Sequence, residues 1–308
     1  TITTTGAIAG VANNNAVEVT SNFTPKLFNL AFGGAGSGTV GAGAAVAIND
    51  VTNAVKAVIL GDQTRINLGD SALLVSAKTL LANMDGEARF DTRSDGDDSI
   101  DLDAQIWSFS IGIGAGGNVG FAGSVNLNWI RNSTQALIDG VTIRDQSAGG
   151  AAGDVTVEAY NNASLTAFAG GASGSSGVAA TVAVSLNFLG GTPDNDGIGS
   201  VDGSGSNLVE AAVNDADLFV NSLTVQTASD GTINAFAASI SGAGSFAGNG
   251  SAALNFMGRQ AVARISSSSN VESINDVSVT SDDRSVIYSG SAQISGSSSV
   301  AIGAAGAY

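Results

Sequence analysis

The chain has 308 residues, of which 44% are hydrophobic, 6% aromatic and 12% charged, with 42 glycines and neither cysteine nor histidine. Its net charge of −16 argues against nucleic acid as a partner, because phosphate binding relies on clustered Lys and Arg. The missing Cys excludes disulfides and thiolate metal sites, and the missing His removes the usual general base. Frequent glycine also disfavours solvated amphipathic helices.

One phrase recurs along the sequence. It reads AAVAINDVTNAVKAVI at 44–59, GSVNLNWIRNSTQALI at 123–138, VAVSLNFLG resumed by NLVEAAV at 182–190 and 207–213, and GSAALNFMGRQAVARI at 250–265. The copies are anchored by Asn49, Asn128, Asn187 and Asn255, at spacings of 79, 59 and 68 residues. The phrase is therefore retained while the unit varies by insertion, as in repeat proteins.

A shorter element with an apolar–x–apolar–x–small pattern closes each unit. It occurs at Val17/Val19/Ser21, Leu73/Val75/Ala77, Val155/Val157/Ala159, Leu223/Val225/Thr227 and Val277/Val279/Ser281. The period of two predicts strands rather than helices.

The two faces of the main strand differ in side-chain size. One carries Val119, Phe121, Val125, Leu127 and Trp129; the other carries Gly120, Ala122, Ser124, Asn126 and Asn128. We expect the bulky face to fill a core and the tiny face to allow another surface to approach closely. The aromatic residues Trp107, Trp129, Phe188 and Phe256 are then expected at or near the core-facing parity.

These patterns predict a β-solenoid of about four and a half imperfect repeats. We expect residues 1–308 to form a single elongated domain, with loops 91–105 and 191–206 as insertions. Alternation alone is also compatible with a sandwich or a barrel, but those folds do not predict near-copies at elastic spacing. The anchoring asparagines are interpreted as a structural amide ladder rather than a ligand site.

The acidic loop 91–105 is the most site-like stretch. Oxygen ligands for Ca²⁺ could come from Asp95, Asp97, Asp98, Asp101 and Asp103. The spacing does not match an EF-hand, so a solvated acidic loop is the alternative. No other cofactor is predicted.

The two ends of the sequence are complementary within the repeat. The final stretch SSSVAIGAAGAY begins another copy of the phrase, with Val300, Ile302 and Tyr308 at repeat positions, and Thr1 and Ile2 continue it in phase. Either the chain is a block of a longer array, or copies of it stack head-to-tail through β-strand edges.

The phrase GAGAAVAINDVTNAVKAVI at 41–59, with its relatives ending NSTQALI and GRQAVARI, resembles the repeats of very large exported bacterial adhesins. These are the leukotoxin-type and filamentous-haemagglutinin-like proteins. The resemblance implies a β-solenoid stalk at the bacterial cell surface or outside the cell, and it carries over no catalytic residues.

We therefore expect a non-enzymatic structural segment of an extracellular filament or adhesin. Its partners would be copies of itself or adjoining repeats, without nucleic acid and without a membrane span, since no run of about 18 apolar residues exists. The alternative is a solenoid enzyme acting on acidic polysaccharide, for which Asp139, Arg144 and Asp145 beside Arg131 would be the candidates.

Overall fold

A computed structural model of the chain describes residues 17–82, 88–89, 104–145, 150–190, 207–266 and 268–308. This part is all-β, and it contains no helix long and apolar enough to cross a membrane. Two large sheets account for nearly all of its strands, and the described strands of these sheets pair in parallel throughout. The arrangement is compatible with a β-helix-like fold.

The first sheet contains β1 (Val17–Phe23), β2 (Leu27–Ser37), β4 (Leu73–Thr79), β7 (Ile106–Gly116), β9 (Val155–Ser175), β13 (Leu223–Ala243) and β17 (Val277–Ser297). The second contains β3 (Val40–Asn67), β8 (Val119–Arg144), β10 (Val178–Leu189), β11 (Leu208–Asn214), β12 (Asp217–Val220), β14 (Phe246–Met257), β15 (Gln260–Ile265), β16 (Asn270–Ser273) and β18 (Val300–Ala307). The short strands β5 (Leu81–Ala82) and β6 (Ala88–Arg89) form an antiparallel pair.

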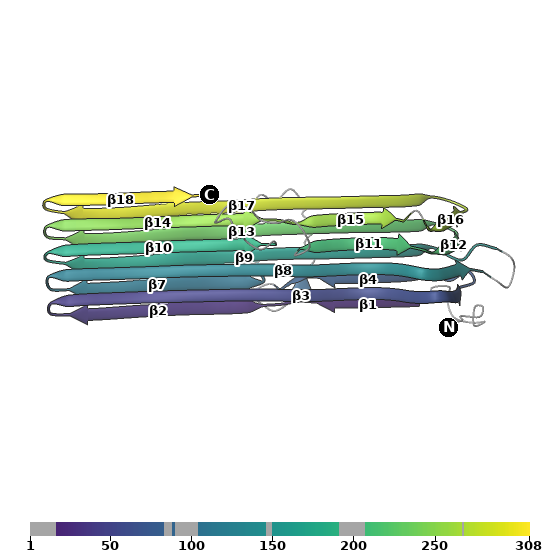
Figure 1. Cartoon of the computed structure of the whole chain (residues 1–308), viewed down its shortest axis with the longest axis horizontal. Coiled ribbons are helices and arrows are strands. Elements are labelled where there is room, and N and C mark those ends of the chain that lie inside the picture. The colour runs from purple at the N-terminus through teal and green to yellow at the C-terminus, as the bar shows by residue number, and fades with distance from the viewer. Residues whose placement is uncertain (1–16, 83–87, 90–103, 146–149, 191–206, 267) are drawn as a thin grey trace.

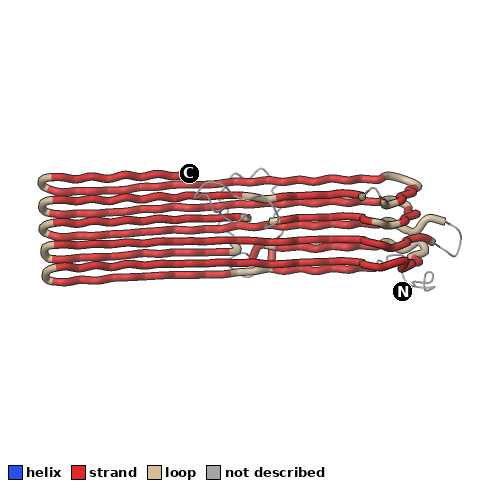
Figure 2. The backbone as a smooth tube through the Cα atoms, viewed as in Figure 1, coloured by secondary structure: helices blue, strands red, loops and turns tan. Residues whose placement is uncertain are grey.

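Each unit of the chain is one long, flat β-arch, called a hairpin below, whose two strands belong to different sheets and face each other. A strand of the first sheet runs to a tight turn, and a strand of the second sheet returns beside it, as β13 and β14 do around residues 244–245. Successive hairpins stack in parallel, with all the tight turns at the left end of the stack and the connections between units at the right (Figures 1 and 2). The molecule is therefore an elongated blade two sheets thick.

We divide the blade into two halves. The turn-side half comprises segments 27–49, 106–129, 165–188, 233–256 and 287–308. The loop-side half comprises the remaining described strands.

The register follows the repeats of the sequence. In the first sheet, the register aligns Val17 with Leu73, Leu73 with Val155, Val155 with Leu223, and Leu223 with Val277. In the second sheet it aligns Asn128 with both Asn49 and Asn187. The third copy resumes after its insertion in the same register, because Leu208 pairs with Ser133. The insertion therefore leaves the ladder on either side of it undisturbed.

The loop-side half has an ordinary apolar core. Its inward residues are bulky, for example Val155, Val157, Val213 and Leu223, all of them at most 1% exposed. Burying one such side chain stabilises the fold by about 1.5–3 kcal/mol. Polar residues such as Glu210 lie on its outer surface, as is usual for a sheet that packs on one face.

In the turn-side half the inward residues are mostly small and the bulky residues face outward. Its sheets lie so close that a Cβ atom added to Gly33 would be 1.7 Å from the carbonyl oxygen of Ala44 in the facing sheet. One added to Gly114 would be 1.6 Å from that of Phe121. Mostly small or flat side chains face inward here, namely Gly, Ala, Ser, Asn and Thr. The larger Ile106, Leu165 and Ile233 face inward only where this half borders the loop-side half.

The prediction that the bulky face fills the core is therefore wrong for this half. Phe121 is 45% exposed and Val125 is 36% exposed, whereas Ser124 and Asn128 are at most 1% exposed. The close approach expected of the tiny face does occur, but between the two sheets of one blade. Because that space is too thin for Val or Phe, the bulky residues point outward.

Two glycines of the turn-side half test this geometry. Gly114→Ala should lower the free energy of unfolding by about 1–3 kcal/mol or more, because its Cβ has no room before the facing backbone. Gly123→Ala is the matched control, since a Cβ there meets nothing within 4 Å. Denaturant unfolding of both variants measures the difference, and equal stability would contradict the close approach.

Candidate functional site

A ladder of side-chain amides runs through the interior of the turn-side half. The Nδ2 atom of Asn49 donates to Oδ1 of Asn128 at 2.6 Å, Asn128 to Asn187 at 2.7 Å, and Asn187 to Asn255 at 2.9 Å. All four residues are at most 4% exposed. Each amide uses one donor and one acceptor along the stack, so the ladder joins four hairpins in one register.

Serine and asparagine side chains extend the ladder across the gap between the sheets. Ser108 of β7 accepts a hydrogen bond from Asn49 at 2.7 Å and donates to Asn126 at 2.6 Å. Asn126 in turn donates to the carbonyl oxygen of Ser108 at 2.7 Å. The interior of this half is therefore held by polar contacts where a bulky apolar core does not fit.

A row of aromatic rings lies on the outer face of the second sheet. Trp129, Phe188 and Phe256 each follow a ladder asparagine by one position. Trp129 and Phe188 stack at a centroid distance of 5.4 Å, Phe188 and Phe256 at 5.0 Å, and Phe256 tilts against Tyr308 at 6.0 Å. The expected core-facing parity is wrong for Trp129, Phe188 and Phe256, because the preceding asparagines take the inward positions. Phe188 and Phe256 are nevertheless buried, at 5% and 8% exposed. Trp107 is buried, and its ring N–H donates to the carbonyl oxygen of Ala104 at 3.1 Å.

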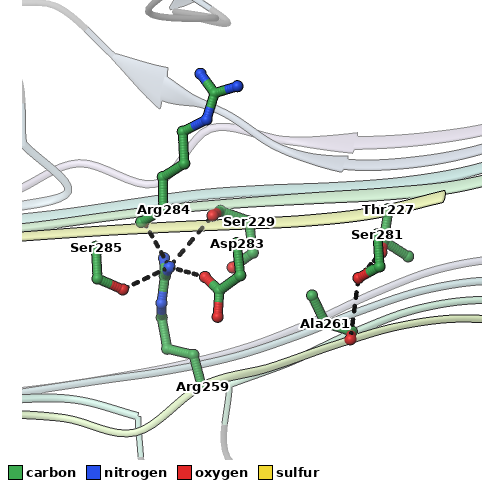
Figure 3. A network of polar contacts seen from close by, with 8 residues as sticks. All are labelled: Thr227, Ser229, Arg259, Ala261, Ser281, Asp283, Arg284 and Ser285. Carbon is green, nitrogen blue, oxygen red and sulfur yellow. Dashed lines mark hydrogen bonds and ion pairs between the residues drawn. The ribbon is translucent and has the colours of Figure 1, made fainter.

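A second polar column crosses the middle of the blade and ends in a buried arginine. The register places Asn132, Asn207 and Arg259 side by side, just before the paired residues Ser133, Leu208 and Gln260. The Arg259 side chain is 2% exposed and forms an ion pair with Asp283 of β17. Its Nη2 atom also donates to the carbonyl oxygen of Arg284 at 2.6 Å and to Ser285 Oγ at 2.9 Å (Figure 3).

Arg259 is a side chain that sequence reasoning missed. Burial lowers the pKa of its guanidinium, and the carboxylates of Asp283 and Asp230 oppose that shift. Space for the side chain comes from Gly231, where a Cβ would lie 2.4 Å from Arg259 Nη1. The available signal was a charge at the repeat position where an earlier copy has Asn132. Through its bonds to β17, Arg259 links the hairpin of β13 and β14 to the hairpin of β17 and β18.

A charged cluster lies on the outer face of the first sheet, in the loop-side half. The carboxylate of Glu158 accepts from Ser76 at 2.8 Å, from Lys78 at 2.9 Å and from Gln226 at 3.0 Å. Burial raises its pKa, but these three donors outweigh burial and hold the pKa below the ordinary value of 4.5. Lys78 also lies over the ring of Tyr160, 5.1 Å from its centroid.

The other predicted site residues lie apart or outside the described residues. Asp95, Asp97, Asp98, Asp101 and Asp103, the loop 191–206, Thr1 and Ile2 are outside the described residues. Val300 and Ile302 are on β18 and are 47% and 59% exposed. Within the described ranges, no group of three or more acidic side chains is arranged to hold a metal ion.

The two arginines among the candidates for polysaccharide chemistry are not brought together. Arg131 forms an ion pair with Asp50, and Arg144 forms one with Asp217 at 2.5 Å. The two arginines lie on the same strand, roughly 43 Å apart at the rise of a parallel strand. Each is thus engaged in its own cross-strand pair.

Comparison of the chain with protein families, with curated proteins and with solved structures gave no match.

Removing one rung of the amide ladder should destabilise the blade. Asn128→Ala leaves the amide N–H of Asn49 and the carbonyl oxygen of Asn187 without their partner, so we expect a loss of about 2–4 kcal/mol in the free energy of unfolding. Asn118→Ala, at an exposed turn position, is the control and should change stability by less than about 0.5 kcal/mol. A small effect of Asn128→Ala would contradict a structural role for the ladder.

The Glu158 cluster predicts a pH dependence. Because the folded-state pKa lies below the unfolded one, its stabilisation is present above about pH 4.5 and is lost as the pH falls through the folded value. In Glu158→Gln this contribution should be missing; it is up to about 1 kcal/mol, because the partner Lys78 is 32% exposed. Melting temperatures of both proteins between about pH 6 and about pH 3 should converge as the pH falls. Glu18→Gln, an exposed glutamate on the same sheet, is the control.

Proposed function

We propose that this chain is a segment of a β-solenoid fibre, of about four and a half repeats, that stacks head-to-tail in an extracellular bacterial filament or adhesin stalk. The observation that carries the proposal is the in-register parallel stacking of near-identical hairpins. Each hairpin presents to the next one the same strand edge and an amide at the same position. Such a contact propagates into a filament because it does not close on itself.

The open edge of the last hairpin supports this proposal. The backbone N–H of Val300 donates to Ser245, just before β14, and that of Tyr308 donates to Ala253 of β14. Alternate residues of a parallel strand direct their N–H groups to opposite sides. Ala301, Gly303, Ala305 and Ala307 therefore present theirs on the other edge, where the described residues provide no paired strand. All of β18 is exposed. An edge of this kind is a template for another strand.

The amide ladder also supports stacking at the edge of β18. At the last described hairpin, Asn255 donates to the backbone carbonyl of Tyr308 at 3.0 Å, in place of a fifth asparagine. The next residue of a stacked copy or of an adjoining repeat would take the ladder position. The acidic composition and the absence of Cys are suited to an exported surface protein, in which load is carried along the axis by backbone ladders.

A proline on the free edge tests head-to-tail stacking. Ala305→Pro removes an outward N–H from β18 while the bonds of its neighbours to β14 remain. We expect the purified chain to form filaments by electron microscopy. The variant should need at least about tenfold more protein to do so, which corresponds to about 1.4 kcal/mol per contact.

Ala305→Ser is the matched control, because it changes the same residue and keeps the N–H. It should assemble like the unmodified chain. A chain that stays monomeric at high concentration, or a proline variant that assembles equally well, would refute head-to-tail stacking.

A further inference from the structure

The turn-side half contains no charged residue. None of the Lys, Arg, Asp and Glu residues of the chain falls within segments 27–49, 106–129, 165–188, 233–256 or 287–308. The loop-side half, the connecting loops and residues 1–26 therefore carry the whole net charge of −16. Charge is thus separated along the length of the blade, and not between its two faces.

Both outer faces of the turn-side half are apolar. On the second sheet, the outward residues of β8 are Val119, Phe121, Gly123, Val125 and Leu127. Their in-register partners on β3, β10 and β14 are all Val, Ala, Gly, Ile, Leu or Phe. On the first sheet, Phe109, Ile111 and Ile113 of β7 pair with Leu30, Phe32 and Gly34, and the rows continue across β9, β13 and β17 with Phe, Gly, Ala and Ile.

These apolar residues are well exposed on both sides of the blade. Phe32 and Ile294 on the first sheet are 66% and 65% exposed, and Ile48 and Val182 on the second are 60% and 53% exposed. Contiguous apolar surface of this extent marks an interaction site. The apolar surface on both faces has to be covered.

The length of the apolar rows matches a lipid bilayer. From Val119 to Trp129 the outer row of β8 spans roughly 33 Å at the rise of a parallel strand. The hydrocarbon core of a bilayer is about 30 Å thick.

The two ends of the rows match the bilayer boundaries. At one end stands the aromatic row of Trp129, Phe188, Phe256 and Tyr308, next to the charged half. Trp and Tyr gather at membrane–water interfaces in the same way. At the other end lie turns such as Gly117–Asn118 and Ser298–Ser299, which are polar and uncharged.

A second copy of the chain fits these surfaces less well. A face-to-face pair would cover one apolar face of each copy and leave the other exposed. Two blades stacked in the same orientation would also place their acidic halves side by side. The hydrocarbon of a lipid bilayer would cover both faces, and it would not bring a second acidic half next to the first.

We propose that the turn-side half inserts, turns first, into the hydrocarbon core of a lipid bilayer, while the charged half stays in water. This inference rests on the proposed stacking, because lipid cannot satisfy the free backbone edges of the outermost strands and neighbouring hairpins can. Apart from those edges, the backbone groups of the half are paired within the two sheets. A fibre of stacked blades would thus lie along a membrane with one side embedded in it.

Flotation with neutral phosphatidylcholine vesicles tests the insertion. The purified chain should float with the vesicles, and added salt should not release it, because apolar contact drives the binding. Phe121→Asp places a charge in the apolar rows and should reduce the floated fraction at least tenfold. Leu60→Asp is the matched control: Leu60 is 64% exposed on the same outer face but lies in the loop-side half, so flotation should be unchanged.

Melting curves show whether each variant remains folded. If Phe121→Asp unfolds, Val182→Asp, on a neighbouring strand, takes its place. A chain that stays with the soluble fraction, or an aspartate variant that floats like the unmodified chain, overturns the insertion. An aspartate substitution that instead dissolves vesicle-free assemblies identifies a second copy as the occupant and also overturns it.

Failure of the stacking can be told apart from failure of the insertion. If the unmodified chain forms no filaments and yet floats with the vesicles, the stacking is wrong while the apolar half still binds lipid. If filaments form and none bind vesicles, stacking holds and the insertion is wrong.

Discussion

The approach of two backbones in the turn-side half is the constraint on which the rest of the blade depends. At several glycines, carbonyl oxygens of one sheet lie less than 2 Å from where a Cβ of the other would lie, so there is no room between the sheets for a side chain at those positions. The usual mode of stabilisation, burial of large apolar side chains, is unavailable there. Backbone ladders and side-chain hydrogen bonds take its place.

Polar groups in so thin an interior require partners, because an unpaired buried amide costs about 1–3 kcal/mol. Stacking of like hairpins supplies partners for the asparagines: Asn128 donates to Asn187 and accepts from Asn49. The same stacking explains why insertions such as 191–206 are tolerated, since they leave the paired segments in register. Where the repeated amide gives way to Arg259, a carboxylate from the other sheet neutralises the buried charge.

The narrow interior also has a consequence for the outer surface. Bulky residues that find no room inside face outward, on both sides of an uncharged half, while the other half of the same strands encloses an apolar core and carries charge outside. One continuous strand thus changes its inner residues from large to small without changing parity. The proposed fibre and the proposed insertion into lipid both follow from this arrangement: the first from the repeated edges, the second from the two outer faces.

The sequence by itself determined that the chain is β, that its units repeat, and which residues share a column, because period-two alternation and repeat spacing are properties of the chain alone. It also separated each strand into a bulky and a tiny face, and it grouped Asn49, Asn128, Asn187 and Asn255 as one set. Only the tertiary structure decided which face of each strand lies inside. That choice depends on the distance between two sheets, which pairs such as Gly114 and Phe121 set through contacts between separate strands. For the same reason, the Arg259 site and the outward aromatic row could not be predicted from spacing, since both depend on what stands opposite a residue in the facing sheet.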